Sequence, residues 1–157
     1  MSTRVARRAR FGYLYRVRQR SPEFYERFAA VYRRIRSLAD QAYAAIDVGS
    51  TQAKFLRHIG ANHRISQAEL ARITETAPTL TGRVLDTLVE YGWVRRERST
   101  EDRREYTLEL TASGKRVRDR VVQARDNLIR RISRVLDERD VADFDRIATK
   151  ILAAFGD

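Results

Sequence analysis

The middle of the chain carries threonine hydroxyl and arginine guanidinium groups that could form hydrogen bonds with a partner. Thr79, Thr81 and Arg83 stand close together in one short segment. A threonine offers a hydroxyl and a methyl group, and an arginine can grip a guanine edge through two parallel hydrogen bonds. A second group, between residues 95 and 104, sets five arginines against three acids: Arg95, Arg96, Arg98, Arg103 and Arg104 against Glu97, Glu101 and Asp102. Both groups suit recognition of a polyanion by hydrogen bonding.

Catalytic and metal chemistry are poorly represented. The chain contains no cysteine, which excludes disulfides, thiolate metal sites and thiol-based redox sensing. Its two histidines, His58 and His63, are too few for a strong metal site. No glycine-rich phosphate loop or nucleophile motif occurs, and no run of 18 apolar residues could cross a membrane. We therefore expect a cytoplasmic protein that is not an enzyme and has no metal or cofactor.

Positive charge is concentrated at the start of the chain. The net charge is +11, of which seven arginines and no acid in residues 1–20 supply +7, leaving +4 for residues 21–157. Such an excess favours a nucleic-acid partner.

Three roles stay open for the basic arm formed by residues 1–20. It could form an extra helix that docks on a dimer, since Phe11, Leu14, Tyr15 and Arg18 have helical spacing; it could reach DNA beside a central site; or it could be disordered. An organelle-targeting sequence is disfavoured because Ser2 is its only serine.

The first long helix is predicted from Ser21 to about Ile46. Ser21, Pro22 and Glu23 are typical of a helix start: a capping hydroxyl, a proline in the first turn and an acid. Apolar residues then recur every three or four positions. A break at residues 47–50 is followed by a short helix whose buried side carries Phe55, Leu56 and Ile59 and which Gly60 ends.

Residues 66–92 predict a helix-turn-helix. The run from Ser66 to Glu69 has the S-x-x-E pattern of a capping box. Residues 74–77 predict a turn, and Pro78 begins a second helix that ends at Gly92. The residues expected on its buried side are Leu80, Val84, Leu85 and Leu88. Two short helices joined by a tight turn define the motif.

The periodicity changes after residue 92. Residues 93–98 and 106–110 predict two strands joined by a polar tip, a β-hairpin of the kind called a wing when it follows a helix-turn-helix. Residues 113–136 then predict a long helix with a nearly heptad apolar seam, and Asp137 can cap a last amphipathic helix. The predicted fold is mainly α with a small β-hairpin wing: a winged helix-turn-helix.

The terminal helices carry more apolar surface than one winged-helix core can cover. Pairing of two chains would bury the remainder, although packing within a single chain is the alternative. We therefore divide the chain into four segments: a basic arm at 1–20, a dimerisation helix at 21–46, a winged helix-turn-helix at 47–111, and C-terminal dimerisation helices at 112–157. A twofold dimer predicts DNA half-sites about ten base pairs apart.

Four local motifs in this order resemble the MarR family of bacterial winged-helix regulators, over roughly residues 22–155. They are Val84-Leu85-Asp86-x-Leu88, Gly92-Trp93-Val94, Asp102-Arg103-Arg104 and Leu110-Thr111-x-x-Gly114. Gly82 departs from the expected pattern, and the segment before it can be offset by one residue. The resemblance implies a sequence-specific DNA-binding regulator, a repressor, that binds a pseudo-palindromic operator as a homodimer. It further implies that Arg104 enters a minor groove and that Asp102 orients it.

The residues can be assigned to a DNA complex on this basis. Thr79, Thr81 and Arg83, near the start of the second helix, would meet base edges in the major groove. Ser66 and Gln67 would hold phosphate at the start of the first, although Ser66 could equally serve only as a helix cap. The arginines assigned to the wing's DNA contacts are Arg96, Arg98, Arg103 and Arg104.

A small-molecule effector also follows from the resemblance. Many family members release DNA when a small aromatic acid or phenol binds between the dimer helices and the winged domain. Tyr32, Tyr43, Arg57 and His58 could line such a site, although His58 could equally be an ordinary surface or core residue. The alternative function is a nucleoid protein that organises DNA without sequence preference, using the basic arm.

Overall fold

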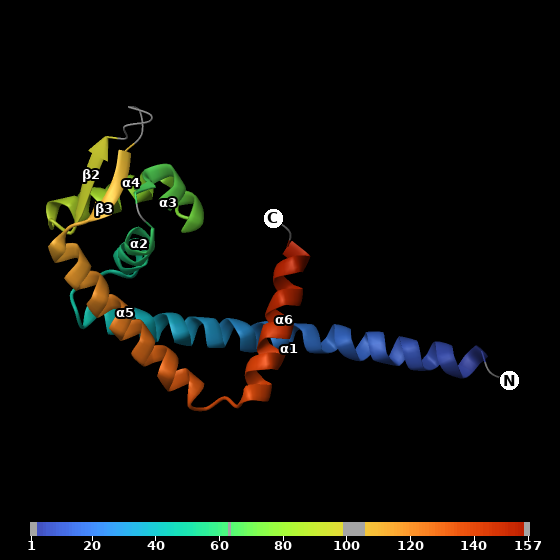
Figure 1. Ribbon diagram of the computed structural model, residues 1–157. Coiled ribbons are helices and arrows are strands. Elements are labelled where there is room, and N and C mark those ends of the chain that lie inside the picture. The colour runs from blue at the N-terminus through green and yellow to red at the C-terminus, as the bar shows by residue number, and fades with distance from the viewer. Residues whose placement is uncertain (1–2, 63, 99–105, 156–157) are drawn as a thin grey trace. The chain divides into compact units, whose positions relative to one another are not determined.

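The computed structural model describes residues 3–62, 64–98 and 106–155, with the backbone alone for residues 3–21. The elements run in the order α1 (Thr3–Ala44), α2 (Ser50–Ala61), β1 (Ile65–Ser66), α3 (Gln67–Ile73), α4 (Pro78–Glu90), β2 (Val94–Arg98), β3 (Tyr106–Leu110), α5 (Ala112–Ser133) and α6 (Glu138–Phe155) (Figure 1). The predicted fold, helices with a small antiparallel sheet, is confirmed. The chain divides into two compact units, one ending at Leu38 and one beginning at Ala39.

Helix α1 is longer than the sequence predicted. It runs without a break from Thr3 to Ala44 with Pro22 in its interior, so the predicted helix start at Ser21 is wrong. A proline lacks the N–H for one helical hydrogen bond but does not forbid its neighbours from being helical. Arginine, glutamine and glutamate, all good helix formers, stand close to it on both sides and carry the helix across.

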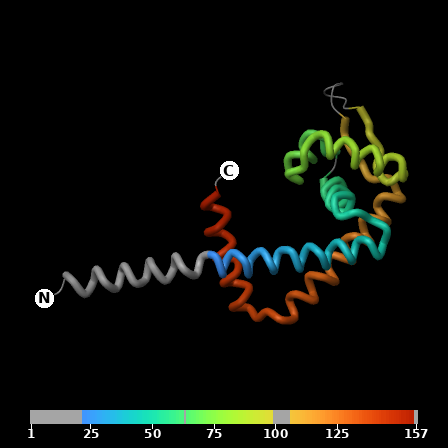
Figure 2. Tube along the Cα trace, turned by 180° about the vertical axis from the view of Figure 1, so that it is seen from behind, coloured from blue at the N-terminus to red at the C-terminus, as the bar shows by residue number. Residues whose placement is uncertain are grey.

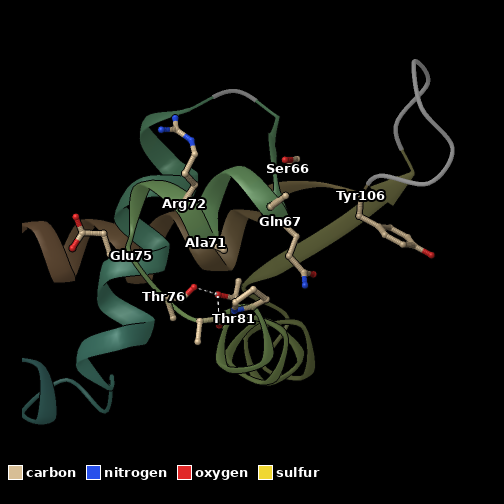
Figure 3. Close-up of a pocket in the computed structure, with 11 residues that line it drawn as sticks. Ser66, Gln67, Ala71, Arg72, Glu75, Thr76, Thr81 and Tyr106 are labelled. Atoms are coloured by element: carbon tan, nitrogen blue, oxygen red, sulfur yellow. Dashed lines mark hydrogen bonds between the residues drawn. The ribbon is translucent and has the colours of Figure 1, made fainter. Parts of the chain in front are cut away.

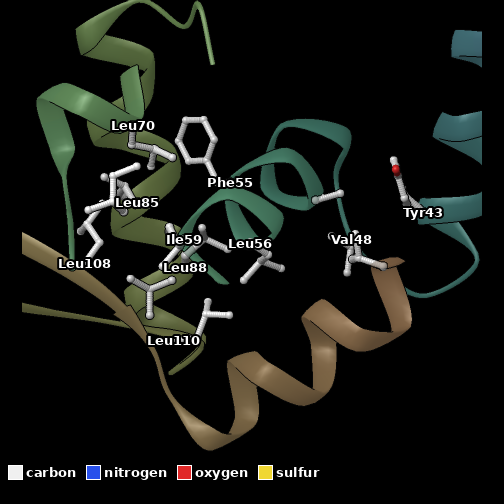
Figure 4. Packing of buried hydrophobic residues seen from close by; sticks show 14 residues of the cluster. Tyr43, Val48, Phe55, Leu56, Ile59, Leu70, Leu85, Leu88, Leu108 and Leu110 are labelled. Atoms are coloured by element: carbon white, nitrogen blue, oxygen red, sulfur yellow. The ribbon is translucent and has the colours of Figure 1, made fainter. Parts of the chain in front are cut away.

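The winged-helix core forms around α2. Ala53, Phe55, Leu56 and Ile59 are buried along that helix, as the predicted apolar side requires. The buried residues that meet them come from the other elements of this unit: Tyr43, Val48, Ile65, Leu70, Leu85, Leu88, Val94, Leu108, Leu110 and Val121 (Figure 4). Figure 2 shows the helix-turn-helix and the strands gathered around α2 from the opposite side.

The sheet has three strands in the order β1-β3-β2, and both pairings are antiparallel. The predicted hairpin is β2 and β3, in which Val94 faces Leu110 and Arg98 faces Tyr106. Strand β1 was not predicted because its two residues, Ile65 and Ser66, carry too short a pattern to show alternation. This strand joins α3 directly to the wing.

The first turn of α5 packs against the backbone at the start of β2. The Thr111 hydroxyl accepts a hydrogen bond from the Gly114 N–H (3.0 Å) and lies 2.6 Å from the Gly92 carbonyl oxygen. A Cβ atom at Gly114 would fall 1.9 Å from the Trp93 carbonyl oxygen, so only glycine fits. The motif Leu110-Thr111-x-x-Gly114 is therefore a joint between the hairpin and α5.

Helix α6 contributes no buried residue. Asp137 caps it as predicted: the Asp140 N–H donates to the Asp137 carboxylate (2.8 Å), and the Asp137 N–H donates to the Asp140 carboxylate (3.1 Å). Large apolar side chains are left exposed along the helix, namely Val141, Phe144, Ile147, Leu152 and Phe155. Within the described residues, no helix combines the length and apolar character that a membrane span needs.

Candidate nucleic-acid interface

Ser66 begins α3 as a cap. Its hydroxyl accepts a hydrogen bond from the Glu69 N–H at 3.1 Å, which is one half of the predicted capping box. The Glu69 carboxylate instead takes two hydrogen bonds from Arg72, at 2.6 and 2.9 Å. These bonds lower the pKa of Glu69, because they stabilise its ionised form. Gln67 follows Ser66 at the first position of the helix.

Helix α4 presents Thr79 and Arg83 on its exposed side, one turn apart. Thr81 lies on the opposite side, fully buried, with its hydroxyl 3.1 Å from the Ala77 carbonyl oxygen and 3.3 Å from that of Thr76. Its assignment as a base-contacting residue is therefore corrected. Leu80, expected in the core, is exposed. A threonine can replace a leucine in the core here because backbone carbonyls satisfy its hydroxyl.

A groove of about 860 Å³ separates the starts of the two helices (Figure 3). Ser66 and Gln67 line it from the start of α3, and Pro78 lines it from the start of α4. Tyr106, the first residue of β3, completes one rim. The first residues of two helices thus line one concave surface, and the positive dipole end of a helix favours anions.

The wing is tied to its surroundings by ion pairs. Arg96 in β2 reaches Asp86 in α4, with 2.7 Å between Nη1 and Oδ1. Glu109 in β3 accepts from Arg95 (2.5 Å) and from Arg64 (3.2 Å). These hydrogen bonds lower the pKa of Glu109. Two of the arginines that raised the charge of the hairpin are therefore partly neutralised by acids of the same unit.

The remaining wing assignments divide into two groups. Arg98, at the end of β2, is exposed and can meet a partner. Asp102, Arg103 and Arg104 lie outside the described residues. The role of Asp86 as the partner of Arg96 was not predicted, although Asp86 belongs to one of the four sequence motifs. Nor was the place of Tyr106 beside the groove, because its sequence signal was only the alternation of a strand.

The four candidate effector residues are found in different settings. Tyr32 belongs to the first unit and is exposed. Tyr43 is buried in the winged-helix core. Arg57 and His58 are neighbours on α2, both half-buried. Burial, followed by repulsion from Arg57 and Lys54, lowers the pKa of His58 and so favours its neutral form.

Arg57 has a further property that bears on ligands. Its Nε is buried and finds no acceptor among the described residues. A neutral imidazole and an incompletely paired guanidinium side by side can serve as hydrogen-bond donors to a carboxylate. No group of three or more histidine or acidic side chains in the described residues is placed to hold a metal ion.

Comparison with known proteins agrees with this geometry. Residues 49–106, from the residue before α2 to the first residue of β3, match the model described as "MarR family". Over these residues the chain is similar to members of the MarR family. The resemblance predicted from the four sequence motifs is thus confirmed.

A curated relative is the HTH-type transcriptional repressor YetL from Bacillus subtilis (strain 168). The two are 47% identical over 55 residues, which is 34% of this chain and 32% of the relative. The chain therefore matches about a third of the relative's length.

Solved MarR-type structures extend the likeness in fold to most of the chain. The MepR–DNA complex from S. aureus covers 83% of this chain and 97% of its own, with a TM-score of 0.76 and 19% identity. A mutant MarR from E. coli complexed with operator DNA covers 81% and 91%, with a TM-score of 0.73 and 24% identity. At these identities the comparison shows the winged-helix fold.

Proposed function

We propose that this protein is a transcriptional repressor of the MarR family that binds a specific DNA sequence as a homodimer. One observation carries the proposal: the exposed side of α4 presents Thr79 and Arg83 one turn apart. A hydroxyl and a guanidinium one turn apart can both meet base edges in a major groove. The relatives named above, a repressor and two DNA complexes, support this interpretation.

In this proposal, α4, the start of α3 and the wing each contact a different part of the DNA. Helix α4 enters the major groove, and Ser66 and Gln67 hold a phosphate at the start of α3. The wing follows the backbone through Arg98 and Arg103, and Arg104 enters the minor groove with Asp102 orienting it. Arg96 acts chiefly through its ion pair with Asp86, which fixes the hairpin to α4. No bond is made or broken, so the protein needs neither catalytic residues nor a cofactor.

Dimerisation is proposed from the exposed apolar residues of the terminal helices. Along α1 these are Phe24, Phe28, Val31 and Ile35, and along α6 they are Val141, Phe144, Ile147, Leu152 and Phe155. Exposed apolar surface of this extent marks an interface. A second copy related by a twofold axis would cover it and set two α4 helices about one turn of DNA apart, giving a pseudo-palindromic site.

An effector is proposed to act at α2. Arg57 and His58 would receive the carboxylate of a small aromatic acid, or the hydroxyl of a phenol, and binding would weaken the affinity for DNA. The buried Nε of Arg57 and the lowered pKa of His58 support a site for a hydrogen-bond acceptor. Tyr32 and Tyr43 stay predictions of the sequence for the ring-binding part of the site.

The test is selection of duplexes from a random-sequence DNA pool by the purified protein, followed by titration of the selected duplex. We expect one inverted repeat with half-sites about ten base pairs apart and two protein copies per duplex. The rival function, DNA organisation by the basic arm, predicts equal affinity for selected and shuffled duplexes with a steep salt dependence. That second result would contradict the proposal.

A further inference from the structure

Lys54 connects α2 to the turn of the helix-turn-helix. Its ammonium nitrogen lies 2.7 Å from the Thr74 carbonyl oxygen and 3.1 Å from the Thr76 hydroxyl oxygen, and it donates to both. The side chain is half-buried, whereas Thr74 and Thr76 are buried. A charged donor on buried acceptors is among the stronger hydrogen bonds in proteins.

The turn that Lys54 holds is strained. The Glu75 N–H donates to the Arg72 carbonyl (3.1 Å) and the Thr76 N–H donates to the Ala71 carbonyl (3.0 Å), the pattern that ends a helix through a left-handed residue. That residue is Glu75, with φ of +48°, where glycine is usual. The turn therefore needs support from outside its own sequence.

The Thr74 carbonyl depends on side chains for its hydrogen bonds. It accepts from Lys54 and from the Thr76 hydroxyl, at 2.7 and 3.1 Å. Because this carbonyl lies at the C-terminal end of α3, where the helix dipole is negative, an ammonium group suits it well. The Thr74 hydroxyl in turn donates to the Leu70 carbonyl at 2.6 Å, which ties the network into the last turn of α3.

The same network reaches α4. The Thr76 carbonyl oxygen lies 3.3 Å from the buried Thr81 hydroxyl, and Figure 3 shows Thr76 and Thr81 side by side beneath the groove. Thr79 and Arg83 stand two residues to either side of Thr81, on the exposed side of α4. Whatever fixes Thr76 and Thr81 therefore also fixes where Thr79 and Arg83 point.

We propose that Lys54 is a positioning residue for DNA recognition: it holds the turn between α3 and α4, and so orients α4, without touching DNA. The inference rests on the proposed function. From the net charge alone, Lys54 would be expected to bind a DNA phosphate. The proposal gives it a different role, inside the protein. Its ammonium group already donates to Thr74 and Thr76 inside the protein.

The test is Lys54→Met, which keeps an unbranched side chain only one atom shorter and removes its donors. The duplex selected by the wild type and a shuffled duplex are titrated over a range of salt concentrations, at a temperature where circular dichroism shows both proteins folded. We expect the affinity for the selected duplex to fall about tenfold, as for a mismatched base pair, with little change for the shuffled duplex. The salt slope should equal that of the wild type, because the variant keeps every group that binds phosphate.

Two further variants complete the design. Lys115→Met removes the same charge from an exposed position of α5 and should leave the affinity ratio of the two duplexes unchanged. Thr76→Val removes one acceptor of Lys54, should reduce the same ratio, and should add little to Lys54→Met in the double variant. It also replaces Lys54→Met if that variant does not fold.

Three results would overturn the inference. Equal loss of affinity for both duplexes with a salt slope lower by about one would make Lys54 a phosphate contact. Lowered thermal stability with an unchanged affinity ratio would make it purely structural. A wild type that selects no duplex would contradict the proposed function itself, and the inference with it.

Discussion

Arg96 in β2 and Asp86 in α4 form an ion pair with 2.7 Å between Nη1 and Oδ1. The pair joins the wing to the helix proposed to read DNA, so the two elements that would contact DNA are fixed to each other as well as to the core. An exposed ion pair contributes little to stability, and more than half of the Asp86 side chain is exposed. We therefore expect the Arg96–Asp86 ion pair to contribute to DNA affinity more than to the stability of the fold.

Asp86→Ala should separate these two effects. We expect a loss of less than about 1 kcal/mol in the free energy of unfolding, as for other exposed pairs. Affinity for the selected duplex should fall about fivefold, or about 1 kcal/mol, because the hairpin is no longer held to α4. Chemical denaturation and duplex titration measure the two quantities. The exchanged pair Asp86→Arg with Arg96→Asp serves as the control, and failure to recover affinity there would show that the pair does not act by joining the elements.

Thr79 and Thr81 offer a matched comparison within one helix. Thr81→Ala should lower the free energy of unfolding by about 1–2 kcal/mol, because it leaves a small cavity and removes a buried hydroxyl. Thr79→Ala, at an exposed position, should change it by less than about 0.5 kcal/mol but alter base preference at one position of each half-site. Thermal unfolding and repeated duplex selection measure the two effects. If Thr79→Ala left the selected sequence unchanged, Thr79 would not contact bases.

These two threonines also show where sequence reasoning reached its limit. The helix-turn-helix, the wing and the capping of α3 and α6 follow from local residue patterns, and the structure has them. The rotation of α4 does not: in the run from Pro78 to Thr81, leucine is the obvious core residue, yet Leu80 is exposed and Thr81 is buried. The carbonyls that satisfy Thr81 belong to the turn, and only the three-dimensional structure brings them to it.

Polar contacts between residues far apart in the sequence could not be predicted from local patterns either. Arg64, Arg95 and Glu109 come together across two strand pairings, and Lys54 lies 20 residues before the carbonyl that it binds. No short pattern in a single sequence indicates such pairings. Pro22 caused the opposite error, because a proline after a serine is typical of a helix start even where a longer helix runs through it.

Gly114 and Gly82 should respond in opposite ways to the same substitution. Gly114→Ala would set a methyl group 1.9 Å from the Trp93 carbonyl oxygen, and we expect a loss of about 3 kcal/mol or more. At Gly82 the nearest atom to an added Cβ is Gln67 Nε2 at 3.8 Å, an ordinary contact. Gly82→Ala should therefore stabilise α4 by up to about 1 kcal/mol. Chemical denaturation of both variants tests this, and a tolerated Gly114→Ala would contradict the tight joint between the hairpin and α5.

The basic arm can be tested by removing it. If the arginines of residues 1–20 contact phosphates beside the operator, deletion should lower the slope of log affinity against log salt by about 0.9 for each phosphate that the arm neutralises. If the arm, which belongs to helix α1, instead docks on a dimer, its deletion should leave the slope the same and the dimer should dissociate more readily on dilution. Duplex titration and light scattering distinguish these outcomes.

The central claim is that the exposed side of α4 reads bases, and Arg83→Ala tests it most directly. Duplex selection should be carried out with the wild type and with Arg83→Ala at the same salt concentration. We predict that the variant loses its preference at one position in each half, symmetrically, with a loss of about 1–3 kcal/mol against the wild-type duplex. An identical selected sequence and an unchanged affinity would contradict the claim.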